Sequence, residues 1–447
     1  MDFIQACREF IAIDSTPSQG SYKAAEFAAK FCENLGLTVE RQVESSAHGE
    51  EMNLIVRPTS FRDGFEFLLQ NHLDTVDPGP FHSWNKTELN PFYASIIDNN
   101  IYGLGAADVK LDFLVKAKVL SEFVNHPNFK LPPVLVATFG EETGMQGALK
   151  LIRKNKINPK YALIGEPTNL TVANAGKGFV SVEIQIPFSE SEIQYRSEHN
   201  LRESTSTQSK VFHGKSAHSS TPHLGDSAII KMLDYLQHLP DSVAIMEIDG
   251  GNNYNTVPSH AFLELDLTPI MNPINSKITT IYKAIKDLEN EFKKIQDSSF
   301  SPSYPTLNIG LIRTFQDHIL ISGSGRILPT ITQEVFDKWM HFLKSSCESC
   351  DSLFRVTDYK KPFKTETSSV FLKGACDTLK ELDLDNQPKS LSSTNEISLF
   401  NRVGVECLGF GPGLRDGNIH TPNEHVSIKD LEVAQIFYRK MIERFCL

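Results

Sequence analysis

Short apolar runs alternate with helically spaced apolar positions through the first third of the chain. Strand-like runs occupy 37–44, 52–57, 65–71, 132–139 and 161–165. Helical spacing covers 2–12, 20–35, 112–124 and 145–154. Buried-type strands separated by helices indicate an α/β domain, in which functional side chains gather at the carboxyl ends of the strands.

The pattern changes near residue 179, where 179–186 alternates like an exposed antiparallel strand. A Ser/Glu-rich segment, 188–210, follows, and we expect a flexible insertion there. Further strands are predicted at 243–249, 260–267, 306–313, 318–324 and 353–359, with helices at 224–238, 276–296 and 331–345. These elements predict an α+β module over 179–362, inserted between a first α/β part, 1–178, and a second, 363–447.

Polar side chains follow the apolar run at 65–69. His72 and Asp74 stand where this strand gives way to a loop, and residues two apart on a strand point the same way. Such a pair suits a metal ligand with an aspartate that orients it. The alternative is a surface histidine beside a turn aspartate.

Four further acidic residues are candidates for the same site. Asp108 lies between a segment rich in small residues and a helix, so it is either a ligand or the cap of that helix. Glu141 and Glu142 end the strand at 132–139, and Glu166 ends the strand at 161–165. Adjacent buried glutamates need charge compensation, which a metal ion would supply, with one glutamate as ligand and the other accepting a proton from water. The alternative is a solvated acidic turn at a helix start.

Composition narrows the class of protein. The chain has 447 residues, of which 40% are hydrophobic and 22% charged, and a net charge of −11. These values predict a soluble globular protein of two or three domains without a nucleic-acid surface. No run of about 18 apolar residues predicts a membrane span. The first residues do not resemble a signal peptide, so we expect a cytoplasmic protein.

Cysteine chemistry adds little to this picture. The seven cysteines are few and scattered, which argues against a disulfide framework. Cys347 and Cys350 form a single CxxC without a second half nearby, a weak indication of a zinc or redox site.

Taken in order, the motifs resemble the dinuclear zinc amidohydrolases and exopeptidases of the aminoacylase type. This family includes acetylornithine deacetylase, succinyl-diaminopimelate desuccinylase, carboxypeptidase G and the aminoacylases. The resemblance covers nearly the whole chain, and the segment from His420 to Glu424 has the family's His-Thr-x-x-Glu form, which favours His420 over the nearby His425. It implies a mixed-sheet α/β zinc-peptidase catalytic domain with an inserted α+β lid and dimerisation domain.

The resemblance also implies two Zn²⁺ ions, with Co²⁺ or Mn²⁺ as substitutes. His72 and Glu166 would hold one ion, and Glu142 and His420 the other, with Asp108 bridging both. Imidazole and carboxylate groups suit zinc, and a bridging carboxylate can hold two ions about 3.5 to 4 Å apart.

Three more roles follow from the resemblance. Glu141 matches the general base, and Asp74 matches the residue that sets the ring of His72. His218 resembles the lid histidine that reaches the active site of the partner subunit and stabilises the tetrahedral oxyanion, which implies a homodimer. His213 and His223 are close enough to exchange with His218 in this assignment.

Recognition of a substrate carboxylate in this family uses an asparagine before a Val-Pro turn and an arginine on a following lid strand. Asn255 supplies the first. Leu267 stands where the arginine is expected, and we favour Arg326 as its equivalent, with Arg313 as the second choice.

The loop at 411–413 would lie beside the substrate, where Gly411 and Gly413 would present backbone N–H groups to its carboxylate. Two positions depart from the family pattern: Leu104 stands where Arg is usual, and Leu111 where Gly is usual. Neither removes a metal ligand, so these departures bear on the substrate rather than on hydrolysis.

The expected activity is hydrolysis of the amide bond of an N-acyl amino acid. A di- or tripeptidase, or a carboxypeptidase, on the same scaffold is the alternative within the enzymes, and a catalytically inactive binding protein is the alternative outside them. The expected partners are a small N-acyl amino acid or short peptide and a second copy of the chain, with neither nucleic acid nor membrane.

Overall fold

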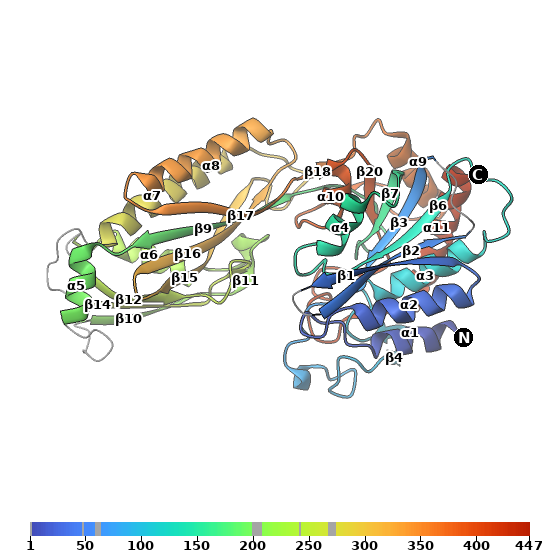
Figure 1. Cartoon of the computed structure of the whole chain (residues 1–447), viewed down its shortest axis with the longest axis horizontal. Helices are drawn as coiled ribbons and strands as arrows, with labels where there is room; N and C mark the ends of the chain where they lie inside the picture. Colours follow the sequence, from blue (N-terminus) through green and yellow to red (C-terminus); the bar gives the residue numbers. More distant parts are fainter. Residues whose placement is uncertain (1, 47–48, 59–63, 199–207, 241–242, 267–273) are drawn as a thin grey trace. The chain divides into compact units, whose positions relative to one another are not determined.

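A computed structural model describes the chain in six stretches, residues 2–46, 49–58, 64–198, 208–240, 243–266 and 274–447 (Figure 1). The chain divides into two compact units. Unit 1 consists of Met1–Ala175, Phe363–Ser390 and Asn395–Leu447, and unit 2 of Gly176–Pro362 and Leu391–Thr394. Each unit has a hydrophobic core of its own.

Unit 1 is built on a mixed sheet in the order β1-β2-β6-β3-β7-β20-β8-β18, with β19 paired to β8. Its strands are β1 Thr38–Ser46, β2 Gly49–Arg57, β3 Glu66–His72, β6 Pro133–Thr138, β7 Pro159–Gly165, β8 Ala173–Gly176, β18 Phe363–Lys364, β19 Lys389–Leu391 and β20 Glu406–Phe410. Strand β3 runs parallel to β6 and β7, and β7 runs parallel to β20. The carboxyl ends of these four strands therefore meet at one edge of the sheet, where the candidate ligands follow them.

Helices cover both faces of this sheet. One face shares a core with α1 Phe3–Ile11, α2 Tyr22–Asn34, α3 Lys110–Ser121, α9 Val370–Glu381 and α11 Ile428–Cys446 (Figure 1). On β3, Phe67 and Leu69 face this core, while the side chain of Gln70 points to the other face and donates to Glu396 beside α10. That other face carries α4 Gln146–Lys154 and α10 Ile397–Arg402, which contact each other.

A small three-stranded sheet joins the two sequence halves of unit 1. It consists of β4 Ser95–Ile97, β5 Asn100–Tyr102 and β21 His425–Ser427, in the order β21-β5-β4. Asp98 and Asn99 form the turn between β4 and β5 with φ of 47° and 63°, which these residue types tolerate. The pairing of β21 with β5 brings the His420 loop to the segment that precedes Asp108.

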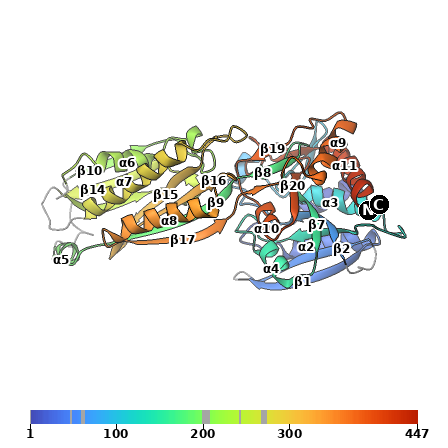
Figure 2. The same cartoon turned by 90° about the horizontal axis from the view of Figure 1, so that it is seen from above.

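Unit 2 is an antiparallel sheet covered by helices on one face. The strand order is β10-β14-β12-β15-β16-β9-β17. The strands are β9 Gly178–Pro187, β10 Gln208–His213, β12 Ala244–Gly250, β14 His260–Asp266, β15 Thr306–Thr314, β16 His318–Ile327 and β17 Leu353–Lys360. Figure 2 shows the three covering helices side by side, α6 Ala228–Leu236, α7 Ile274–Lys293 and α8 Gln333–Glu348.

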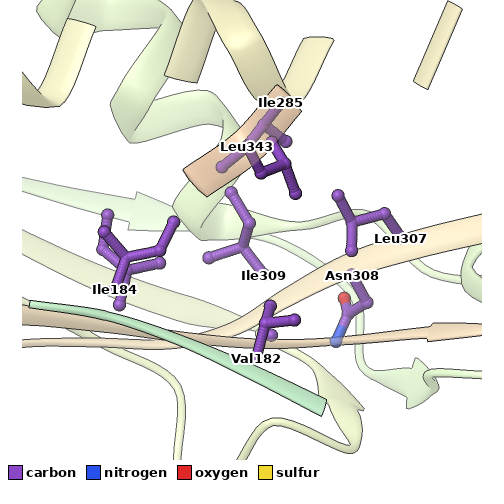
Figure 3. Close-up of a pocket in the computed structure, with 9 residues that line it drawn as sticks. Val182, Ile184, Ile285, Leu307, Asn308, Ile309 and Leu343 are labelled. Carbon is purple, nitrogen blue, oxygen red and sulfur yellow. The ribbon is translucent and has the colours of Figure 1, made fainter. Parts of the chain in front are cut away.

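The interior of unit 2 is closely packed. Figure 3 shows apolar side chains such as Val182, Ile309 and Leu343 around a cavity of about 10 Å³ between the sheet and the helices. That volume is near the minimum for a single water, so this space belongs to the core and is no ligand site.

Shorter elements of the chain are η1 Phe81–Ser83, β11 Ala217–His218, η2 Pro222–Leu224 and β13 Thr256–Val257.

The structure corrects one expectation about unit 2. The segment predicted to be flexible contains a helix, α5 Glu190–Glu198, while 199–207 lies outside the described residues. Glu192 accepts the backbone N–H of Ile274 (2.7 Å), and the Tyr195 hydroxyl donates to Asp266 (2.7 Å). The polar side chains that suggested flexibility thus hold the helix against distant parts of the unit, so the prediction is wrong for α5.

The predicted fold class is confirmed: a mixed-sheet α/β unit is interrupted in sequence by an α+β unit.

Leu267, which stands where the family's arginine is expected, lies outside the described residues. Over the described part of the chain, no helix combines the length and the apolar character needed to span a membrane. All seven cysteines are free thiols in the structure.

Candidate metal centre

Two groups of three side chains converge at the carboxyl edge of the unit 1 sheet. His72, Glu141 and Glu142 form one group, and Asp108, Glu142 and His420 form the other. Within each group, the potential ligand atoms lie within 4.8 Å of one another. Glu142 belongs to both groups, so the two clusters form one continuous site.

His72 is the last residue of β3 and is almost fully buried. Its Nδ1 lies 3.1 Å from the backbone oxygen of Asp74, and its Nε2 lies 3.2 Å from Asp108 Oδ1. Burial pulls the pKa of His72 down, but the carboxylates of Asp108 and Asp74 outweigh burial and hold this pKa well above its usual value. The surface-histidine alternative is therefore excluded.

Asp108 faces a different histidine with each carboxylate oxygen. Oδ1 lies 3.2 Å from His72 Nε2, and Oδ2 lies 3.2 Å from His420 Nε2. Burial alone would raise the pKa of Asp108, but the hydrogen bonds from His420 and His72 lower it overall. The N-cap of α3 is Val109, so Asp108 is not the helix cap. A carboxylate with one ligand histidine on each oxygen has the arrangement required to bridge two ions.

Asp74 orients the two adjacent glutamates. Its Oδ1 accepts the backbone N–H of Glu141 (3.0 Å), and its Oδ2 accepts that of Glu142 (2.9 Å). The carboxylate lies 3.6 Å from His72 Nδ1, farther than the backbone oxygen of the same residue. The backbone oxygen of Asp74 thus contacts His72, while the side chain of Asp74 holds the backbone of Glu141 and Glu142.

Glu141, Glu142 and Glu166 concentrate negative charge around this site. Burial, together with repulsion from Glu142 and Glu166, raises the pKa of Glu141 well above its usual value despite the opposing effect of His72. Burial raises the pKa of Glu166 to about 7, although Arg415 lies 3.4 Å from Glu166 Oε2 and opposes this shift. Glu166 joins neither of the two convergent groups among the described residues.

These observations test whether metal ions fit the site. Asp108, Glu141 and Glu142 converge on two histidines. Burial, together with repulsion from neighbouring carboxylates, raises the pKa values of Glu141 and Glu166. Divalent cations supply such charge, and imidazole and carboxylate donors are ligands of zinc and its neighbours. The residues present therefore fit a dinuclear metal centre.

Glu424 is a buried carboxylate that the sequence reading did not single out. It accepts the backbone N–H groups of Gly105 (3.2 Å), Ala107 (2.8 Å) and Asp108 (3.0 Å). Burial raises its pKa to about 7. The His-Thr-x-x-Glu motif could have identified Glu424 as a residue of the site, because it places Glu424 in the same loop as His420.

Two other residues near the centre were missed. Glu396 is buried and accepts hydrogen bonds from Thr138 (2.8 Å) and from Gln70, and burial raises its pKa to about 8. Arg415 approaches Glu166 from the loop before His420. Each stands in a polar stretch, where the sequence does not reveal burial.

The candidate recognition residues of unit 2 form a second cluster. Arg326 is buried and donates to Asn255 Oδ1 (3.0 Å) and Ser219 Oγ (3.4 Å). The Asn255 amide nitrogen lies 3.3 Å from His218 Nε2. Asn308 donates to the backbone oxygens of Tyr254 (3.2 Å) and Thr256 (3.0 Å), which fixes the segment that carries Asn255.

The competing residues lie elsewhere in unit 2. Arg313 forms an exposed ion pair with Asp249 (3.0 Å). The His213 ring packs against His260, and His223 lies in the exposed turn η2. The geometry therefore groups Arg326 and His218 with Asn255, and leaves Arg313 and His213 outside the cluster.

Gly411 and Gly413 pack against the loops that carry the ligands. The Gly411 N–H donates to Thr168 Oγ1 (3.0 Å), so it is used within the protein and is not available to a substrate. An added Cβ at Gly411 would come within 2.5 Å of the Glu166 backbone oxygen, and one at Gly413 within 2.6 Å of the Ala107 oxygen. Close backbone approach accounts for both glycines.

Comparisons with known proteins show the family of this chain. Residues 68–444 match the model of Peptidase family M20/M25/M40. An acetylornithine deacetylase of Myxococcus xanthus is 22% identical over 98% of this chain and 96% of its own. Another, from Buchnera aphidicola subsp. Schizaphis graminum, is 30% identical over 87% of this chain and 83% of its own.

Solved structures share the fold. The aminoacylhistidine dipeptidase of Vibrio alginolyticus matches with a TM-score of 0.65 at 15% identity, over 99% of this chain and 96% of that one. The YXEP protein of Bacillus subtilis, described as a dinuclear metal-binding peptidase of the M20 family, matches with a TM-score of 0.54 at 12% identity, over 98% and 96%. The chain belongs to Peptidase family M20/M25/M40 and is a metal-dependent hydrolase of amide or peptide bonds.

Proposed function

We propose that the protein is a zinc-dependent amidohydrolase that removes the acyl group of an N-acyl amino acid, as acetylornithine deacetylase and succinyl-diaminopimelate desuccinylase do. The observation that carries this proposal is the pair of ligand groups that share Glu142. Full-length similarity to proteins named acetylornithine deacetylase supports the choice of substrate class.

In this proposal, His72 and Glu166 would hold one Zn²⁺, Glu142 and His420 would hold the other, and Asp108 would be shared by both, with Co²⁺ or Mn²⁺ as substitutes. When bound, such ions polarise the amide carbonyl and lower the pKa of the attacking water. The opposed contacts of Asp108 with His72 and His420 support this division of ligands.

Glu141 is the proposed general base. Its backbone N–H donates to Asp74 (3.0 Å), and a carboxyl oxygen lies within 4.8 Å of the potential ligand atoms of His72 and Glu142. Glu141 takes the proton of the attacking water and then donates it to the nitrogen of the departing amine, which balances the hydrolysis. Asp74 assists by holding the turn that aims this carboxyl.

The unit 2 cluster is the proposed recognition part. Arg326 and Asn255 would bind the carboxylate of the substrate, for which a guanidinium and an amide are suited donors. The resemblance further implies that His218 acts in the active site of the partner subunit, so we propose a homodimer. A cytoplasmic location remains part of the proposal, and cell fractionation tests it.

A di- or tripeptidase is the second candidate. The similarity in fold to an aminoacylhistidine dipeptidase favours it, because the same centre can hydrolyse a peptide bond next to a free carboxylate. A catalytically inactive binding protein is the third candidate, and the convergence of four of the five expected ligands with Glu141 weighs against it.

A substrate panel separates the three candidates. Purified protein is offered N-acetyl and N-succinyl amino acids beside dipeptides and tripeptides, with added zinc and again after chelation. We expect hydrolysis of acylated amino acids that chelation abolishes and zinc restores. Hydrolysis of peptides alone would support the peptidase, and absence of both metal uptake and turnover would support the binding protein.

A further inference from the structure

A buried polar cluster lies behind the metal centre, between β3, α3 and α11. We call it the Asn71 cluster, and it consists of Asn71, Asp112, Lys116 and Tyr438, none of which is more than 1% exposed. None of the four belongs to the ligands or to the recognition residues. Burying an ion pair contributes little net stability compared with apolar side chains, so its retention calls for another explanation.

Asp112 is the acceptor on which the cluster is built. Its carboxylate accepts from the Tyr438 hydroxyl (2.7 Å), from Asn71 Nδ2 (2.9 Å) and from Lys116 Nζ (2.9 Å). The Lys116 ammonium also donates to the backbone oxygen of Gln70 (2.9 Å). The first turns of α3 are thereby joined to the last residues of β3.

Asn71 touches the chain next to three of the proposed ligands. It immediately precedes His72, and its Nδ2 also lies 3.3 Å from the backbone oxygen of Val109, the neighbour of Asp108. A Cβ added to Gly165, the neighbour of Glu166, would come within 2.2 Å of Asn71 Nδ2. Because Gly165 has no side chain, the Asn71 amide can occupy this space.

We propose that Asn71 and the Asp112–Lys116 ion pair are positioning residues that set the spacing of His72, Asp108 and Glu166. Asp112 orients the amide of Asn71, and this amide holds the Val109 carbonyl and packs on Gly165. This inference rests on the proposed metal-binding function. It goes beyond that function because it assigns the spacing of the ligands to groups that contact neither metal nor substrate.

The opposite end of β3 offers a matched control. Glu66, the first residue of the strand, is fully buried, pairs with Arg57 Nε (2.8 Å) and accepts the backbone N–H of Asn158 (3.0 Å). The Glu66 carboxylate is as deeply buried as that of Asp112, and both ion pairs contact the same strand. The Glu66 pair differs in lying at the far end from His72.

The test compares Asp112→Asn with Glu66→Gln. Each change replaces a buried carboxylate with an amide of the same shape, so each turns one acceptor atom into a donor facing other donors. Zn²⁺ affinity is measured by competition with a chelating dye, and the visible spectrum of the Co²⁺-loaded protein reports ligand geometry. We expect D112N to bind metal 10- to 100-fold more weakly with an altered spectrum, while E66Q stays within about twofold of the parent protein.

Each outcome decides the question. Parent-like affinity and spectrum in D112N, or equal weakening in D112N and E66Q, would overturn the positioning role. Failure of the parent protein to bind any divalent ion would instead contradict the proposed function. If D112N does not fold, Asn71→Ser replaces it in the same comparison, because this change removes both amide contacts and keeps the ion pair.

Discussion

The candidate sites of the two units contain side chains of opposite charge. In unit 1, the carboxyls of Glu141, Glu166 and Glu396 repel one another, and burial raises their pKa values. In unit 2, the buried Arg326 lies near Lys177, whose pKa burial and Arg326 lower to about 8. These charges suit the proposed division between metal binding in unit 1 and recognition of a substrate carboxylate in unit 2.

The largest expected effect comes from Glu141→Gln in unit 1. Removing the proposed base while keeping its shape should lower kcat by about 10²- to 10⁴-fold. Metal content measured by elemental analysis should stay at the parent level, since the expected ligands remain. Parent-like turnover in a metal-loaded E141Q protein would remove the chemical role from this residue.

A smaller effect is expected from Arg326→Met in unit 2. Loss of a charge-assisted contact with a substrate carboxylate, worth about 1.5–3 kcal/mol, should lower kcat/KM by about 10- to 100-fold, mainly through KM. Steady-state kinetics on the preferred substrate measures this change. Arg313→Met is the matched control, because Arg313 pairs with Asp249 on the exposed side of β15. A larger loss in R313M than in R326M would contradict the assignment of the cluster.

The smallest expected effect concerns stability. A buried carboxyl such as that of Glu396 makes the free energy of unfolding depend on pH. Burial raises the pKa of Glu396 to about 8 from its usual 4.5. Between these values the folded protein holds a proton that the unfolded chain lacks, so stability from this group is full below pH 4.5 and is lost up to pH 8.

From pH 6 to pH 7, this group alone should lower the free energy of unfolding by about 1.4 kcal/mol. Glu396→Gln should remove that contribution. Urea unfolding of the chelator-treated parent and E396Q proteins at both pH values checks the difference. An identical pH dependence in the two proteins would show that Glu396 is ionised in the folded state.

The sequence predicted the elements of unit 1 and its strand-end residues because that signal is local. His72, Glu142 and Glu166 each follow an apolar run, and parallel pairing brings such positions to one edge. The sequence did not show in the same way which polar side chains are buried. Glu396 and Glu424 stand in polar stretches, and only contacts with β3, β6 and the Asp108 segment show that they lie inside the protein.

Unit 2 was harder to predict for the same physical reason. Asn255 and Arg326 come together across 71 residues of sequence, so no local pattern selects Arg326 over Arg313. The segment of α5 was predicted to be flexible because it is rich in polar residues. The partners of these side chains, such as Ile274 for Glu192, lie far along the chain and are not visible in the local sequence. Side chains with distant partners are those that periodicity cannot assign.

The contact between Glu424 and Asp108 has a consequence for synthesis of the protein on the ribosome. These two residues are separated by 316 positions, and His420 comes from the same late segment. A nascent chain that has completed only the first part of unit 1 has neither the carboxylate that holds the Asp108 loop nor this histidine. The centre as described can therefore assemble only after the ribosome has added the segment that contains His420 and Glu424.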